Sequence, residues 1–253
     1  MFNLPINRKH LHNSYYLIFF EVQKKHWWFV AKKKIVLDLI QRFVPAREGG
    51  HRILDIGCGS GLMLNSLEQI GETNGMDMSD EAIGFSREIF SGTVKKGMLP
   101  DDIPFEDEYF SLITALDVIE HVEDDCATLK AIRAKMAQGG QAIITVPACM
   151  FLWSKHDVLN EHKRRYTRSE LREKLIEAEF SIEKISYFCT FLFPAISLVR
   201  IVSNVLKLKN GSDVDLPSPL VNYMLQKIFS TEKLFLRFMN FPIGVSVLAV
   251  VRK

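Results

Sequence analysis

Residues able to do chemistry gather first in the stretch Asp55-Ile-Gly-Cys-Gly-Ser-Gly61, which follows a short apolar run. Glycines let a backbone turn tightly and approach a ligand closely, and the helix predicted after them directs free N–H groups at that ligand. Asp55 precedes the glycines, where its charge disfavours a phosphate and favours a cationic amino acid. Asp77 ends the next predicted strand, and a carboxylate there can accept both hydroxyls of a ribose. Nicotinamide dehydrogenases have a similar turn and are the rival interpretation.

The segment Trp153–Tyr166 mixes aromatic, acidic and basic side chains in a predicted loop. His156 and His162 are candidate proton acceptors, because imidazole titrates near neutral pH. The spacing of these histidines and Asp157 is not diagnostic of a metal, so no metal site is predicted. A charged, solvent-facing loop is the alternative. Substrate contacts are expected from the loop's other ionisable and aromatic groups, of which the arginines can grip a carboxylate or phosphate: Asp157, Arg164, Arg165 and Tyr166.

An alternation of strands and helices positions these residues, which is typical of a parallel sheet with helices on both faces. The carboxyl ends of parallel strands share one edge, where ligands of such folds bind. His121 follows the fourth strand at that edge and can act as a base or bond to backbone. Strands are predicted at 52–56, 73–76, 93–95, 110–116, 141–146, 181–188 and 245–251, and helices at 62–70, 124–137 and 168–178, with a turn at 139–140.

Helical segments flank and interrupt this pattern. Residues 1–50 are predicted as a helical extension or lid, in which Trp27 and Trp28 cover a cofactor, pack against the sheet or meet a membrane surface. Residues 51–188 with 241–253 are predicted as the cofactor-binding domain. Residues 189–240 form an apolar helical insertion, broken at 210–219, that serves as a substrate cap, a membrane contact or a private core.

Composition narrows the functional classes. A net charge of +2, with 47% hydrophobic and 25% charged residues, indicates an ordinary globular chain and gives no sign of nucleic-acid binding. The 4 cysteines lack metal-site spacing, so a reducing cytoplasm is expected. The most apolar long window, 187–206, contains Pro194, Arg200 and Asn204, which make it a poor membrane span.

Taken in order, the motifs resemble those of class I S-adenosylmethionine-dependent methyltransferases. The stretch 55–61 is similar to their motif I, Gly75-Met-Asp77-Met-Ser to their ribose-binding strand end, and 99–105 with 109–113 to their "LPF…FD" segment. Thr114-Ala-Leu-Asp-Val-Ile-Glu-His-Val122 resembles the strand-four motif of the subgroup around ubiquinone- and menaquinone-pathway methyltransferases (type 11/12). The match covers roughly residues 50–150. It implies an α/β, Rossmann-like sheet of seven strands with an antiparallel last strand, an N-terminal helical extension and a helical insertion before the last strand.

The resemblance also implies which residues hold the cofactor. Asp77 would hold the ribose, Met78 would pack on the adenine, and the carbonyl of Leu116 would meet the methionine amine. Relatives place an acid after Gly97 for the adenine amino group; this chain has Met98, so the backbone of Met98 and Leu99 is expected to read adenine. Met78 and Met98 as plain core residues are the alternative. The remaining expected contacts are Asp55, Gly57, Cys58, Gly59 and Gly61 at the methionine moiety, and Trp28 as a lid.

The sequence therefore predicts an enzyme that transfers a methyl group from S-adenosylmethionine, producing S-adenosylhomocysteine. The acceptor is expected to be small or lipid-like, such as a prenylated or lipid-linked amphiphile with a polar or anionic head. Oxygen is favoured over nitrogen or carbon by analogy with the quinone-pathway relatives. A non-catalytic cofactor-binding partner protein is the main alternative, and the absence of a base-flipping motif disfavours a nucleic-acid substrate. The expected location is the cytoplasm, with peripheral contact to the inner face of the membrane as an extension.

Overall fold

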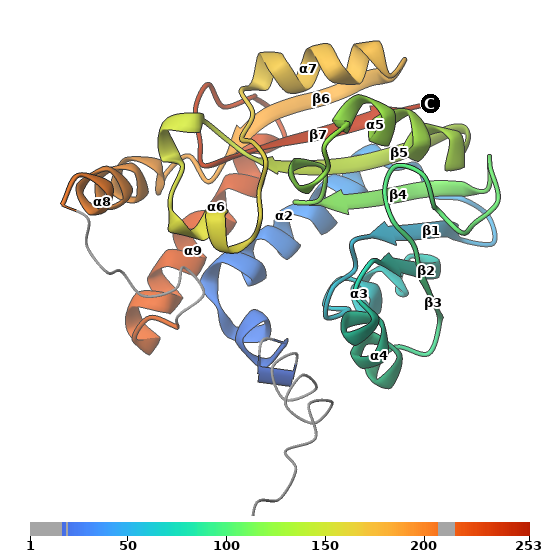
Figure 1. Cartoon of the computed structure of the whole chain (residues 1–253), viewed down its shortest axis with the longest axis horizontal. Helices are drawn as coiled ribbons and strands as arrows, with labels where there is room; N and C mark the ends of the chain where they lie inside the picture. The colour runs from blue at the N-terminus through green and yellow to red at the C-terminus, as the bar shows by residue number, and fades with distance from the viewer. Residues whose placement is uncertain (1–16, 19, 207–215) are drawn as a thin grey trace, which may run out of the picture.

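A computed structural model describes residues 17, 18, 20–206 and 216–253. Residues 1–16 and 19 of the predicted extension, and residues 207–215 of the predicted insertion, therefore lie outside the described residues. The described chain is built around one sheet of 7 strands in the order β3-β2-β1-β4-β5-β7-β6 (Figure 1). β5 and β6 both pair with β7 in antiparallel fashion, and the other pairs are parallel. The sheet predicted from the sequence is confirmed.

The central strands coincide with hydrophobic runs, because strands buried on both faces are apolar almost throughout, although β5 begins before its predicted start. Every residue of β4 except the last is buried, as are the first six of the seven residues of β7. The strands are β1 His51–Ile56, β2 Gly71–Asp77, β3 Thr93–Lys96, β4 Phe110–Leu116, β5 Met136–Pro147, β6 Ser181–Phe188 and β7 Ser246–Arg252.

Helices connect the strands, and several begin at a side-chain cap. The Ser79 side chain accepts from the Ala82 N–H, and Thr167 with Glu170 forms a capping box. Helix α2 packs along α9, which lies beside it in Figure 1. The helices are α2 Trp27–Phe43, α3 Leu64–Leu67, α4 Asp80–Ile89, α5 Asp125–Lys135, α6 Lys155–Leu159, α7 Arg168–Glu177, α8 Phe193–Val205 and α9 Pro219–Leu236, with short 3-10 turns η1 Ile119–His121 and η2 Met150–Leu152.

Three local predictions are wrong, and the first is the loop expected over Trp153–Tyr166, which contains helix α6. The helix expected over 62–70 is only the single turn α3, because the glycine turn continues past Gly61 before the chain becomes helical. The turn expected at 139–140 is part of β5, whose pairing with β4 shifts register between Phe110 and Leu112. A side chain at Gly140 would stand 2.9 Å from the Phe110 carbonyl oxygen, so this glycine permits a close approach of two strands rather than a chain reversal.

Candidate active site

The glycine turn follows β1 and is fixed to the end of β2. Gly57, Gly59 and Gly61 have φ angles of 68°, 52° and 76°, in the left-handed region that favours glycine. A Cβ at Gly57 would stand 2.6 Å from Val118 Cγ2, which leaves no room for a side chain. The N–H groups of Gly57 and Cys58 donate to the Met76 carbonyl at 2.7 and 3.0 Å. The turn is therefore a cradle whose shape depends on glycine at these positions.

Asp77 lies at the rim of this cradle, with its carboxylate held by backbone. Oδ2 accepts from the Gly59 N–H at 2.8 Å, and Oδ1 accepts from the Ser79 N–H at 2.9 Å. A carboxylate has about four lone-pair positions, so each oxygen keeps capacity for another donor. The side chain is thus oriented for a ligand that brings two hydroxyl groups.

Asp55 is 3% exposed and accepts a hydrogen bond of 2.6 Å from Thr114 Oγ1. Burial raises the pKa of Asp55 to about 7, against the lowering effect of Thr114, and the charge of Asp77 raises it further. A cation bound beside Asp55 would favour the ionised form, and the role of Asp55 toward such a ligand stays a prediction.

The other predicted cofactor residues lie around the same turn. Met78 and Met98 are 66% and 57% exposed, which excludes the alternative that they are core residues. The Met98 N–H already donates to the Asp102 carbonyl at 2.8 Å, so it is not free to read adenine without rearrangement. Leu116 ends β4 at the same edge, Cys58 is buried, and Leu99 is half-buried.

The N-terminal region contacts the glycine turn, helix α9 and strand β6. Ser60 Oγ donates to Gln23 Oε1, which ties the helical residues 20–25 to the glycine turn. Asn222 of α9 accepts from the Trp27 N–H at 2.9 Å and donates to the Lys25 carbonyl at 2.8 Å. The Trp28 ring packs against Phe229 with 5.2 Å between centroids, and against Phe188, so it meets apolar groups of α9 and β6.

Sequence reasoning missed the ion pair that closes the end of β4. Lys32 Nζ of α2 lies 2.6 Å from Asp117 Oδ2, and Thr145 Oγ1 donates to Asp117 Oδ1 at 2.8 Å. Burial alone would raise the pKa of Asp117, but the Lys32 ammonium outweighs it and holds the pKa below its usual range. No local pattern could have revealed a contact between positions so far apart in the chain.

The predicted loop places His162 against a buried carboxylate. His162 Nδ1 lies 2.9 Å from Asp157 Oδ1, and Asp157 also accepts from Arg165 Nε and Nη2 at 2.8 and 3.0 Å. Burial would raise the pKa of Asp157, but hydrogen bonds from His162 and Arg165 outweigh it and keep the carboxylate ionised. An ionised Asp157 accepts a hydrogen bond from the protonated Nδ1 of His162, so the lone pair of the imidazole lies on Nε2.

Glu120 and His121 form a cluster with this imidazole of His162. One ligand-type atom from each lies within 4.8 Å of the other two, a donor set that suits a proton relay or a divalent metal. The rings of His121 and His162 are 4.7 Å apart and perpendicular. Both carboxyl oxygens of Glu120 are buried and have no hydrogen-bond partner among the described residues, and burial raises the pKa of Glu120 well above its usual range. The sequence selects His121 and His162 but not Glu120.

The remaining predicted substrate residues have partners within the chain. Asp125 accepts from Arg164 Nη1 at 3.0 Å, from the Tyr166 hydroxyl at 2.8 Å and from Lys174 Nζ at 2.8 Å. Arg165 is buried and also donates to the Ala148 carbonyl. These contacts account for the loop's shape, and acceptor binding by Arg164, Arg165 and Tyr166 stays a prediction. His156 lies at the rim of the cluster, with 6.0 Å between its ring centroid and that of His162.

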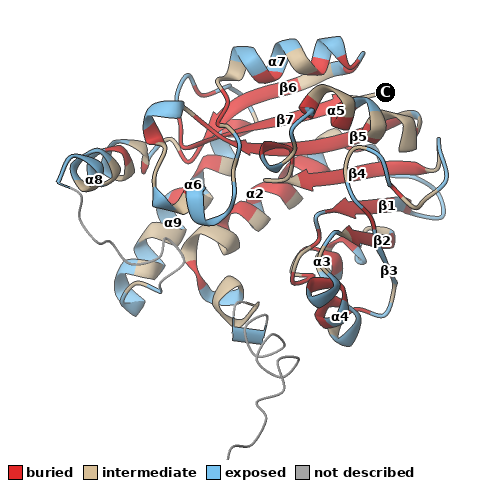
Figure 2. Ribbon diagram, in the orientation of Figure 1, coloured by how far each residue is buried: buried red, intermediate tan, exposed pale blue. Residues whose placement is uncertain are grey.

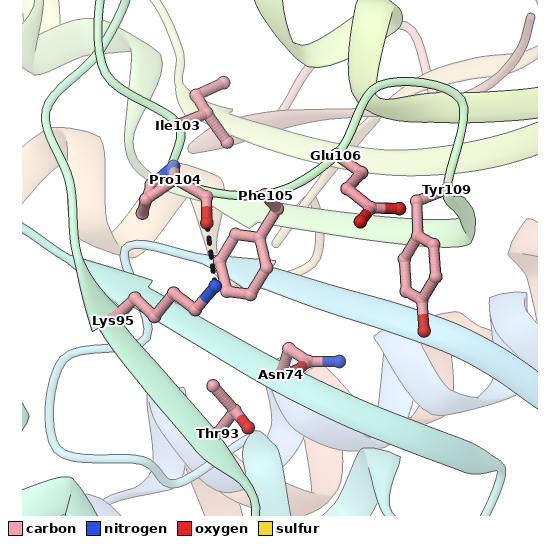
Figure 3. Close-up of a pocket in the computed structure, with 8 residues that line it drawn as sticks. All are labelled: Asn74, Thr93, Lys95, Ile103, Pro104, Phe105, Glu106 and Tyr109. Carbon is pink, nitrogen blue, oxygen red and sulfur yellow. Dashed lines mark hydrogen bonds between the residues drawn. The ribbon is translucent and has the colours of Figure 1, made fainter.

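An open pocket of about 480 Å³ lies away from this cluster (Figure 3). It is lined by β2, β3 and the 103–109 segment, and Lys95 Nζ donates to the Pro104 carbonyl at 3.0 Å across it. It contains none of the side chains described above, so we assign it no part in the site. Its lining residues are Asn74, Thr93, Lys95, Ile103, Pro104, Phe105, Glu106 and Tyr109.

Comparison with known families decides the broader identity. Residues 29–185 match the model of a family described as "Methyltransferase domain". The chain belongs to this family. The match covers the glycine turn, Asp77 and the His162 loop, so both parts of the candidate site lie within the methyltransferase domain.

Named relatives are more distant. A ubiquinone biosynthesis O-methyltransferase of Pseudomonas aeruginosa is 26% identical over 141 residues, which are 50% of this chain and 60% of that protein. This methyltransferase therefore spans only about 60% of the length of that curated relative. A chain from the complex of a Haloferax volcanii methyltransferase with its Trm112 activator aligns with a TM-score of 0.61 at 18% identity, over 94% of both chains. A Mesorhizobium loti S-adenosylmethionine-dependent methyltransferase aligns with a TM-score of 0.57 at 16% identity, over 85% of this chain and 95% of that one. Both alignments bear out the fold.

Proposed function

We propose that this methyltransferase uses S-adenosylmethionine to methylate a small amphiphilic acceptor, at oxygen in the first instance, and that nitrogen or carbon are the alternatives. The observation that carries the cofactor is the carboxylate of Asp77, held by two backbone N–H groups at the rim of the glycine cradle. When bound there, S-adenosylmethionine supplies a methyl group on a sulfonium. Asp77 then accepts from the ribose hydroxyls, and Asp55 faces the cationic end of the methionine.

The acceptor is expected beside His162. Asp157 orients this imidazole through Nδ1, so Nε2 takes up the proton that an acceptor hydroxyl loses as its oxygen bonds to the methyl carbon. His121 and Glu120 lie beside this imidazole, with one ligand-type atom of each within 4.8 Å of one on His162. These groups give the protein a place to hold a proton, which a non-catalytic cofactor-binding partner would not require.

The acceptor class rests on the surroundings and on the relatives. The insertion between β6 and β7 is rich in exposed apolar side chains, and the loop beside it carries Lys163 and Arg164. A compound with an apolar tail and a polar or anionic head fits both features. The name of the Pseudomonas relative supports methylation at oxygen. Within the described residues no helix is both long and apolar enough to cross a membrane. As separate proposals, we place the protein in the cytoplasm and divide it into an extension (1–50), a cofactor domain (51–188 with 241–253) and an insertion (189–240).

The test of the cofactor is calorimetric titration with S-adenosylmethionine and S-adenosylhomocysteine. We expect micromolar binding by the wild type and a loss of about 100-fold in Asp77→Ala, because two charge-assisted hydrogen bonds are removed. Asp80→Ala is the matched control, since Asp80 lies nearby in α4 but pairs with Lys96 at the surface. Equal binding by Asp77→Ala and wild type would contradict the proposal. Release of S-adenosylhomocysteine in an acceptor screen then separates an enzyme from a non-catalytic partner.

A further inference from the structure

Helix α8 is amphipathic, but its polar side chains face the protein and its apolar side chains are exposed. Its polar side chains Ser197, Arg200 and Asn204 recur at helical spacing and face the protein. Arg200 Nη1 donates to the Leu152 carbonyl at 3.1 Å, and Asn204 Nδ2 donates to the Trp153 carbonyl at 2.8 Å. Ser197 is the only buried residue of this fully described helix. Two of these polar side chains therefore attach α8 to the end of η2 and to the residue after it.

The opposite face of α8 is apolar and exposed. Leu198, Val202 and Val205 recur at i, i+4 and i+7 and are 64%, 40% and 73% exposed. Figure 2 shows α8 projecting from the body of the protein with exposed residues along its length. A surface helix ordinarily places its aliphatic side chains inward, so this orientation indicates an apolar environment outside the chain.

The apolar face continues onto neighbouring elements. Phe151 of η2 is exposed and its ring meets Phe193 of α8 edge-on at 6.1 Å. Helix α9 packs on α2 and exposes Leu220 and Met224 at four-residue spacing, with Phe238 beyond its end 84% exposed. We call the exposed apolar side chains of η2, α8 and α9 the apolar surface.

Charge distinguishes between occupants of the apolar surface. The only acid in α8 and α9, both fully described, is Glu232, which is buried and accepts from the Phe191 N–H at 2.8 Å. The exposed ionic group among the apolar side chains of α9 is the Lys227 ammonium, and Lys233 lies half-exposed on the same helix. An apolar face with cations and no exposed acid complements an anionic bilayer, with the helices lying in the interfacial plane.

We propose that the apolar surface docks this methyltransferase onto an anionic lipid bilayer. The inference rests on the proposed function, which it deepens, because an amphiphilic acceptor resides in a bilayer. η2 leads directly into α6, which carries Asp157, so docking brings the His162 cluster to the lipid surface. The acceptor's apolar tail then remains in the lipid while its head reaches the site.

The test is co-sedimentation of the full chain with vesicles of phosphatidylcholine, with and without phosphatidylglycerol. We expect binding to the anionic vesicles. The triple variant Leu198→Gln, Val202→Gln, Val205→Gln should lose at least about tenfold in vesicle affinity, because it removes apolar area that the bilayer would bury. Lys227→Gln should weaken binding about fivefold, and added salt should do the same. Ile176→Gln is the control: Ile176 is 54% exposed on α7, away from the apolar surface, and should have no effect.

Three results overturn the proposal. The first is no vesicle binding by a wild type that still binds S-adenosylmethionine. The second is equal vesicle binding by wild type and triple variant. The third is a wild-type dimer that the triple variant dissociates, measured by light scattering without vesicle binding, which would assign the face to a second copy. Failure of the cofactor titration alone would reject the proposed function and leave vesicle docking standing.

Discussion

The cofactor cradle and the His162 cluster lie at the same edge of the sheet but are built by different means. The cradle is held by backbone groups: the N–H groups of Gly57 and Cys58 donate to the Met76 carbonyl, and the Gly59 N–H donates to the Asp77 carboxylate. In the cluster, side chains hold other side chains: Arg165 holds Asp157, and Asp157 holds His162. The cradle depends on local conformation and the cluster on contacts between buried charges. The two should therefore fail in different ways when altered.

The largest expected effect is on stability, in the cluster. Arg165→Ala leaves the Asp157 carboxylate buried without its main partner, and we expect a loss of about 3–5 kcal/mol in the free energy of unfolding. Urea denaturation followed by tryptophan fluorescence measures it. Arg164→Ala is the control, because its partner Asp125 keeps Lys174 and Tyr166; a loss of about 1 kcal/mol is expected there. Equal losses in the two variants would contradict the view that Asp157 depends on Arg165 more than Asp125 depends on Arg164.

The second prediction separates the two regions functionally. His162→Gln should lower turnover by about 10²–10⁴-fold, because the proton acceptor is lost, while the Kd for S-adenosylmethionine stays unchanged. S-adenosylhomocysteine release on an acceptor found with the wild type measures the rate, and His156→Gln, at the rim, is the control. If a chelator abolishes wild-type turnover and a divalent metal restores it, the cluster is a metal site and the role of His162 as base is wrong.

The third prediction concerns the cradle. Gly57→Ala should lose about 2 kcal/mol of stability and abolish cofactor binding, because it adds a contact with Val118 to an unfavourable positive φ. Gly139→Ala is matched in φ, at 66°, but meets nothing within 4 Å, so it should lose only about 1 kcal/mol and bind the cofactor normally. Thermal unfolding and calorimetric titration measure both. Similar results for the two variants would show that the close approach to Val118 is unimportant.

The smallest expected effect is a pH dependence of cofactor affinity. With the pKa of Asp55 at about 7, binding of a cation must displace a proton at lower pH. The Kd for S-adenosylmethionine should therefore be about tenfold weaker at pH 6 than at pH 8. Asp55→Asn should bind weakly and without this dependence. In the free protein the sign is opposite: the folded state retains a proton that the unfolded state releases, so this group lowers stability as pH rises from about 4 to 7.

The difference between the backbone-built cradle and the side-chain-built His162 cluster also explains which features the sequence could predict. The cradle was predictable because φ angles and close backbone approach demand glycine at fixed local spacing, as at Gly57, Gly59 and Gly61. The strands were predictable because burial on both faces makes them apolar. The partners of Asp117, Asp125 and Asp157 were not, since Lys32, Lys174 and Arg165 are selected by three-dimensional packing and no periodicity marks them. The helix predicted over 62–70 is reduced to one turn because the glycine turn continues past Gly61.

The position of β7 has a consequence for synthesis. β7 lies between β5 and β6 and hydrogen-bonds to both, so β6 has no partner strand until β7 has been made. A ribosome releases β1 to β5, with the glycine turn and Asp77, as a set that can pair at once. β6 and the helices beside it wait for residues 246–252. The cofactor cradle can thus assemble on a nascent chain, whereas β6 gains its partner strand only after translation has passed β7.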